Sequence, residues 1–172
     1  MDEIVRLASQ VLQTTPARWL TLSQTVDVSL QCRRPAPGEW SAVECLLHLV
    51  EAEREVFPVR LQRFLAGQDF DAFNPDEGAP PEAARLDPLA LSTEFEQRRT
   101  ESLHLLAGVG AEDLQRTARH PELGRVPLDQ MIHEWAAHDL MHTVQAERAL
   151  MQHFVAGCGP WLEYFREHVV KS

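Results

Sequence analysis

Two histidines one helical turn apart are the residues of this chain with the most specific chemical potential. His138 and His142 lie in the segment EWAAHDLMH, which starts at Glu134 within a long stretch of helical periodicity. Residues four apart project from one face of a helix, so the two imidazoles can bind a single divalent metal ion. Eight histidines in 172 residues can also fall four apart by chance, and core histidines are often satisfied by carbonyl groups. The spacing alone therefore leaves both interpretations open.

A metal site here needs a third ligand from another part of the chain. The segment is not an H-E-x-x-H motif, because Asp139 follows His138 where that motif has the glutamate base of a metalloprotease. His48 is the candidate third ligand, since the small residues Cys45 and Ala52 on its helix face leave space around it. Cys45 is either a fourth ligand, which would close the site into a structural one, or a small buried hydrophobe.

Several other polar residues near the candidate ligands have two interpretations each. Asp139 either orients an imidazole or is a solvated surface residue or part of an intrahelical ion pair. Glu44 and Glu51 lie one turn either side of His48 and are candidate general bases, although a capping role already explains Glu44. His120 begins a proline-containing turn, where a structural hydrogen bond is the default and entry to the site mouth is the alternative. The other histidines are predicted at the surface or at helix ends, and three tryptophans are predicted to pack in the core: His104, His133, His153 and His168; Trp40, Trp135 and Trp161.

The elements that must position these residues are predicted to be nearly all helical. Apolar residues recur with the 3.6-residue period between Pro- and Gly-rich breaks, and no extended alternating pattern of a strand appears. The first helix begins at Asp2 and is predicted to kink or split at Thr15-Pro16. The second begins at the Ser41 capping box, and Pro58 predicts a kink within it. The expected order is helices at 2–22, 41–66, 87–108 and 128–154 and a short one from 160, with an irregular loop at 68–86 and a turn at 120–124.

This pattern predicts one all-α domain spanning residues 1–172. Four principal antiparallel helices with a short extra C-terminal helix form a four-helix bundle. The length of 172 residues and mass of 19.5 kDa fit a single domain. No apolar run reaches the roughly 18 residues of a membrane span, and the N-terminus lacks the positive start of a secretory signal. We therefore expect a cytoplasmic protein whose three scattered cysteines are reduced thiols.

The charge of the chain excludes some partners. Its formal net charge of −10 argues against a nucleic-acid-binding surface and against docking on anionic lipid. A small-molecule substrate remains compatible with this charge. Three histidines around a cation would make the site locally positive inside an acidic shell.

Three segments resemble the DinB/YfiT superfamily. They are RPAPGEWSAVECLLHL from Arg34, HPELG from His120, and WAAHDLMH from Trp135, in that order. The resemblance covers nearly the whole chain and implies a four-helix bundle of DinB/YfiT type. In that family one histidine after a W-S-x-x-E segment and two from H-x-x-x-H form a three-histidine metal site. The matching positions here are His48, His138 and His142.

The resemblance also implies an activity. Three neutral histidines with open water positions suit Zn²⁺ or Ni²⁺, with Mn²⁺ or Fe²⁺ as further alternatives. Related proteins include metal-dependent hydrolases and transferases that use thiols such as bacillithiol or mycothiol, in which the metal activates water or the thiol. The alternative function is a non-enzymatic, stress-associated metal- or ligand-binding module with a structural metal. The resemblance further suggests a homodimer.

Overall fold

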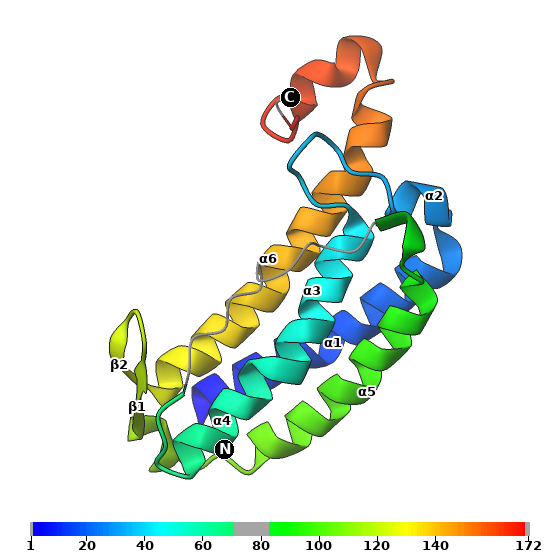
Figure 1. Cartoon of the computed structure of the whole chain (residues 1–172). Helices are drawn as coiled ribbons and strands as arrows, with labels where there is room; N and C mark the ends of the chain where they lie inside the picture. The colour runs from blue at the N-terminus through cyan, green and yellow to red at the C-terminus, as the bar shows by residue number, and fades with distance from the viewer. Residues whose placement is uncertain (1, 71–82, 171–172) are drawn as a thin grey trace.

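Four long helical segments pack side by side in the computed structural model, which describes residues 2–70 and 83–170 (Figure 1). Helix α1 contacts α5 and α6, and α3 contacts the same two helices from the opposite corner of the bundle. The predicted all-α four-helix bundle is confirmed. The segments are α1 (Glu3–Thr25), α3 (Ala42–Glu55) continued by α4 (Phe57–Leu65), α5 (Pro88–Ala107) and α6 (Leu128–Val155), with a short α2 (Val28–Gln31) between α1 and α3.

Helix α1 runs unbroken past Pro16, so the predicted kink or split at Thr15-Pro16 is wrong. Proline has no N–H and leaves the carbonyl of Leu12, four residues earlier, without its helical donor. The guanidinium of Arg99 on α5 supplies that donor, with Nη1 at 2.9 Å from the Leu12 oxygen. Thr15 Oγ1 donates to the same carbonyl at 3.3 Å. A donor from another helix therefore keeps α1 continuous.

The second predicted helix is present in two parts. Its capping box is confirmed: the Ser41 N–H donates to Glu44 Oε2 at 2.8 Å, and the Glu44 N–H donates to Ser41 Oγ at 3.4 Å. The helix breaks at Val56, two residues before Pro58, where φ is −115° and ψ is −82°. The proline then occupies the first turn of α4, the position at which its missing N–H costs least. The predicted kink is confirmed as a break that separates α3 from α4.

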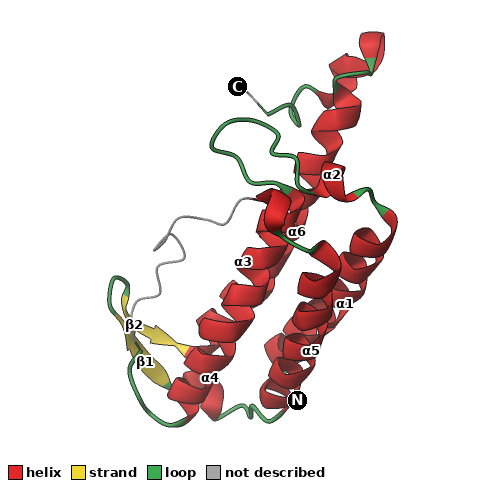
Figure 2. Ribbon diagram, turned by 45° about the vertical axis from the view of Figure 1, so that its right-hand side comes forward, coloured by secondary structure: helices red, strands yellow, loops and turns green. Residues whose placement is uncertain are grey.

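A β-hairpin lies between α5 and α6, where the sequence suggested only a turn. Strand β1 (Thr117–His120) pairs antiparallel with β2 (Gly124–Pro127), and the predicted turn at 120–124 joins them (Figure 2). Gly124 has φ +76°, a left-handed conformation that favours glycine. Strands of four residues are too short to show a clear alternation of apolar and polar residues, so the pattern did not reveal them.

The remaining predicted boundaries agree with the structure except at the C-terminus. Asp87 caps α5 by accepting from the N–H groups of Leu89 and Ala90, and α6 has nearly the predicted bounds. The predicted fifth helix is a 3₁₀ segment, η3 (Gly159–Phe165), in which Trp161 is 64% exposed rather than in the core. The predicted loop at 68–86 lies mostly outside the described residues, apart from the 3₁₀ turn η1 (Ala83–Arg85). None of the described helices combines the length and apolar character needed to span a membrane.

Candidate metal centre

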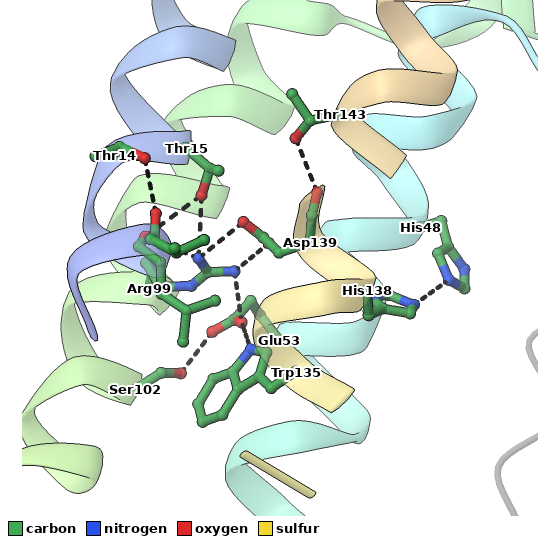
Figure 3. Close-up of polar contacts among 12 residues, drawn as sticks. Thr14, Thr15, His48, Glu53, Arg99, Ser102, Trp135, His138, Asp139 and Thr143 are labelled. Carbon is green, nitrogen blue, oxygen red and sulfur yellow. Dashed lines mark hydrogen bonds and ion pairs between the residues drawn. The ribbon is translucent and has the colours of Figure 1, made fainter. Parts of the chain in front are cut away.

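The three predicted ligands meet between α3 and α6. His48 comes from α3, and His138 and His142 come from one face of α6; one ring nitrogen from each lies within 4.8 Å of the others. The Nε2 atoms of His48 and His138 are 3.0 Å apart (Figure 3). The ring centroid of His142 lies 4.4 Å from that of His48 and 4.5 Å from that of His138. The sequence pattern thus identified three side chains that converge on one point.

These imidazoles are held in their neutral form. Burial lowers the pKa of His138 to about 3, and the positive charges of His142, His48, Arg99 and Arg60 lower it further. Burial also lowers the pKa of His142, against the opposing effects of its hydrogen bond with Gln145 and of the Asp139 charge. A neutral imidazole keeps a lone pair, which is the form in which histidine binds a metal.

Hydrogen bonding determines which nitrogen of His142 faces the cluster. Its Nδ1 lies 2.9 Å from Oε1 of Gln145, an oxygen that can only accept, so the proton sits on Nδ1 and Nε2 keeps a lone pair. His138 Nδ1 is buried and has no hydrogen-bond partner within the described part of the chain. Two neutral imidazoles that meet through Nε2 can share only one proton. A cation among the three rings would instead use a lone pair from each, so the donor set fits a metal ion.

Aromatic side chains form the walls of the cluster. The half-buried Trp40 stacks on His142, with centroids 5.6 Å apart and planes 17° apart, and its ring lies 5.1 Å from that of His48. Phe57 contacts His138 edge-on at 5.1 Å, and Trp135 stacks behind Phe57 at 5.3 Å. Trp135 is buried as predicted, whereas Trp40 packs partly on the core and partly on the site.

A cavity of about 380 Å³ adjoins the Trp40 side of the cluster. Its lining includes Gln145, which bonds His142, so the cavity reaches the immediate surroundings of the site. Its walls come from the segment before α3, from α6 and from the C-terminal segment: Pro35, Glu39, Trp40, Met141, Val144, Gln145, Arg148, Ala149 and Val170. A small molecule can approach the histidines from this side.

Cys45 lies in the apolar core rather than in the histidine group. It is fully buried in a cluster that includes Trp19, Leu49 and Phe95, and burial raises the pKa of its thiol to about 12. Among the described residues, no cysteine or carboxylate joins the three histidines. The structure therefore supports the interpretation of Cys45 as a small hydrophobe.

The two candidate bases differ in their environment. Glu44 accepts hydrogen bonds from Arg34 and Ser41, which outweigh the effect of burial and hold the pKa of its carboxyl below the usual range. It is therefore engaged as a capping residue. Glu51 is half-buried, and burial raises its pKa despite the opposing charge of Arg54. Glu51 thus remains the candidate base.

Asp139 is buried in an ion pair between helices, so the prediction of a solvated residue or an intrahelical pair is wrong. Its Oδ1 lies 2.6 Å and its Oδ2 3.3 Å from the Arg99 guanidinium. Arg99 also pairs with Glu53 at 2.9 Å. Glu53 in turn accepts from Ser102 at 2.6 Å and from Trp135 Nε1 at 2.9 Å. The Asp139 carboxylate therefore bonds Arg99 and not an imidazole.

The sequence analysis missed Glu53 and Arg99, the two charged partners of Asp139. The available signal was their position, since Arg99 lies one turn after the buried Phe95 on α5 and Glu53 follows the buried Ala52 on α3. We refer to Glu53, Arg99 and Asp139 as the buried triad. Figure 3 shows the triad on one side of α6 and the His48–His138 pair on the other.

The other histidines lie away from this centre. His120 Nδ1 accepts from the N–H groups of Glu122 and Leu123 at 3.2 and 3.3 Å, so its predicted structural role in the turn is confirmed. The four histidines predicted at the surface or at helix ends are exposed: His104, His133, His153 and His168.

Comparison with known proteins agrees with this geometry. The family model described as the DinB superfamily matches residues 12–146, a range that contains all three histidines and most of the bundle. The chain belongs to the DinB superfamily. No curated protein matches its sequence.

Among solved structures, this DinB-superfamily chain is similar to YfiT from Bacillus subtilis. That protein is described as a probable metal-dependent hydrolase with an unusual four-helix bundle topology. The two share 15% identity over 90% of each chain, with a TM-score of 0.74. At this identity the likeness establishes the shared fold, and the resemblance to the DinB/YfiT superfamily seen in the sequence is confirmed.

Proposed function

We propose that His48, His138 and His142 bind one divalent metal ion and that the chain is a metal-dependent hydrolase. The observation that carries this proposal is the convergence of three neutral imidazole rings with no fourth His, Cys, Asp or Glu in the group among the described residues. Three protein ligands leave coordination positions for water and substrate, as in catalytic zinc sites. Three nitrogen ligands suit Zn²⁺ or Ni²⁺, with Mn²⁺ and Fe²⁺ as alternatives set by availability.

The residues of the chain would divide the work as follows. When bound, a divalent ion supplies Lewis acidity that lowers the pKa of a coordinated water. Gln145 holds the His142 ring with Nε2 toward the cluster, and Trp40 and Phe57 exclude bulk water from two sides. Glu51 lies on α3 one turn after His48, and its raised pKa suits a carboxylate that accepts a proton from water near neutral pH.

Two alternatives share the same ligands. A low-molecular-weight thiol such as bacillithiol could occupy the open positions and be activated for transfer to an electrophile. A structural metal in a non-enzymatic module would need a closed site, and the burial of Cys45 in the apolar core argues against closure by its thiolate. The hydrolase and the transferase are separated by assay.

The test begins with metal content and continues with activity. Metal-free protein is loaded separately with Zn²⁺, Ni²⁺, Mn²⁺ or Fe²⁺ and screened against ester, amide and phosphoester substrates, with thiol transfer to a model electrophile run in parallel. We expect one metal ion per chain and metal-dependent hydrolysis, both lost in His138→Ala and His142→Ala. The exposed His133 on the same helix is the matched control, and His133→Ala should retain both. A metal content well below one ion per chain, or a His138→Ala variant with unchanged content, would overturn the proposal.

A further inference from the structure

Arg60 on α4 is a second buried arginine, and its surroundings differ from those of Arg99. The residue is 8% exposed, and its neighbours along α4, Phe57, Leu61 and Phe64, are buried in the apolar cluster at this end of the bundle. Its guanidinium lies over the ring of Phe70 at 5.1 Å. A charge removed from water requires compensation by an opposite charge or by hydrogen bonds.

That compensation is incomplete for Arg60. Its ion-pair partner among the described residues is Glu134, at 3.9 Å from Nη1, and the Glu134 side chain is 54% exposed. A separation of 3.9 Å is beyond hydrogen-bonding distance, and burial lowers the pKa of Arg60. The triad arginine, by contrast, has two carboxylates within 3 Å.

The guanidinium nitrogens of Arg60 remain accessible. Buried side-chain atoms that lack a partner within the described part of the chain include Nε of Arg99 but no atom of Arg60. Since the Arg60 nitrogens lack close partners there and still are not sealed, a ligand can reach them. Arg60 therefore presents donor groups from an otherwise apolar wall.

This wall adjoins the histidine cluster. Phe57, which contacts the edge of His138 at 5.1 Å, lies three residues before Arg60 on α4. Glu134, the loose partner of Arg60, lies four residues before His138 on α6. Both paths place Arg60 about one helical turn, roughly 5 Å, from the histidine cluster.

We propose that Arg60 binds a carboxylate of the substrate, so that the reacting group rests at the three histidines. This inference relies on the proposed hydrolase function and defines its substrate class. The substrate would be a small organic molecule with a carboxylate about 5 Å from the carbonyl that is attacked. A guanidinium fork binds a carboxylate through two parallel hydrogen bonds, which would complete the compensation that Glu134 leaves partial.

The competing explanation is purely structural. In that case Arg60 only packs its stem against the apolar cluster, contacts Phe70 and Glu134, and has no effect on ligands. Two small probes separate the explanations: acetohydroxamate, which binds a metal and carries no charge elsewhere, and succinic acid monohydroxamate, which adds a carboxylate two methylene groups away. The affinity of each for Zn²⁺-loaded protein is measured by titration calorimetry.

We expect the carboxylate probe to bind wild-type protein about tenfold or more tightly than acetohydroxamate, because charge-assisted hydrogen bonds are strong. This advantage should fall to less than twofold in Arg60→Gln and in Arg60→Met, the latter keeping an apolar stem in case the former folds poorly. Arg63→Gln is the matched control, since it removes the same charge from an exposed site on the same helix. Glu134→Gln should increase the advantage, because it removes the internal anion that competes for Arg60.

The outcomes distinguish this inference from the function on which it relies. If the protein binds Zn²⁺ and both hydroxamates equally well, the inference is wrong and the metal site stands. If the advantage persists in both Arg60 variants, another residue binds the carboxylate and the inference is also wrong. If no Zn²⁺ is bound, the proposed function fails and takes the inference with it.

Discussion

Helix α6 presents two buried polar clusters on opposite sides, and they are stabilised in different ways. On one side Asp139 joins Glu53 and Arg99, whose charges and hydrogen bonds meet within the protein. On the other side His138 and His142 meet His48, and the three rings direct like groups at one another. Asp139 and His138 are adjacent in sequence, so two neighbouring residues belong to clusters of opposite character.

The difference shows which kind of buried polarity indicates function. Each carboxylate of the triad has a donor from another helix, so the triad connects α3, α5 and α6, and Arg99 also reaches α1. The histidine cluster gives the fold no comparable set of matched pairs, because three acceptor nitrogens need a cation that the chain itself does not supply. A cluster that completes its own interactions supports the structure, whereas an incomplete one predicts a ligand.

Removal of the triad arginine is the largest expected perturbation. Arg99→Met leaves Glu53 and Asp139 buried without their cation and deprives the Leu12 carbonyl of its donor. Breaking a buried ion pair by removing one partner costs about 3–5 kcal/mol. We expect the free energy of unfolding in urea to fall by that amount, or the variant to be unfolded.

The matched control for this change removes all three charges together. The combination of Arg99→Met with Glu53→Gln and Asp139→Asn should recover part of the loss, since no uncompensated charge remains. If Arg99→Met alone lost less than about 1 kcal/mol, the triad would not be the structural cluster of the pair.

Metal removal tests the opposite side of α6. A ligand that binds only the folded state at 100 times its Kd adds about 2.7 kcal/mol to the free energy of unfolding. We expect wild-type protein with saturating Zn²⁺ to lose roughly this amount when a chelator is added, followed as a shift in the thermal melting temperature. His138→Ala should show no response to chelator, and His133→Ala should respond like wild type. Equal responses of these two variants would place the metal elsewhere.

The sequence predicted the histidine cluster because its signal was local. His138 and His142 share a face through helical geometry alone, and the capping box fixed the start of the helix that carries His48. The elements α5 and α6 were similarly predictable from the Asp87-Pro88 cap and from apolar periodicity. Their assembly into a three-residue site then followed from the family resemblance.

What the sequence could not show depends on contacts between helices. Pro16 predicts a break when α1 is considered alone, and only the Arg99 side chain from α5 explains its continuity. The environment of Asp139 likewise depends on Arg99, forty residues away in sequence. Charged residues are assigned to the surface by default, so a triad that compensates itself in the core leaves almost no trace in the pattern.

The pH dependence of the metal-free protein should reflect the depressed pKa of His138. The folded state holds that pKa at about 3, below the ordinary value of 6.5, so between these values the unfolded chain binds the proton and the folded chain does not. This contribution to stability is present above pH 6.5 and is lost progressively as the pH falls toward 3. Over the range from pH 7 to pH 5 it amounts to about 2 kcal/mol.

The measurement compares urea unfolding of wild type and His138→Ala in chelator at both pH values. Carboxylates contribute to the pH dependence of both proteins, so the difference between the two isolates His138. The wild type should lose more stability than the variant on acidification. Parallel losses would show that the imidazole is not held neutral in the folded state.

The smallest effect is expected at Gln145, which connects the cluster to its surroundings. Its Oε1 accepts from His142 Nδ1 at 2.9 Å and thereby fixes the ring with Nε2 toward the other histidines. Loss of such an orienting hydrogen bond costs 10- to 100-fold in metal affinity in other sites, so Gln145→Ala should weaken Zn²⁺ binding by about tenfold, roughly 1.4 kcal/mol. Gln145→Glu retains an acceptor oxygen and should keep or increase the affinity, as measured by competition with a chromogenic chelator. If Gln145→Ala binds Zn²⁺ as tightly as wild type, the cluster orients its rings without help, and the contrast with the triad, whose members depend on one another, becomes weaker.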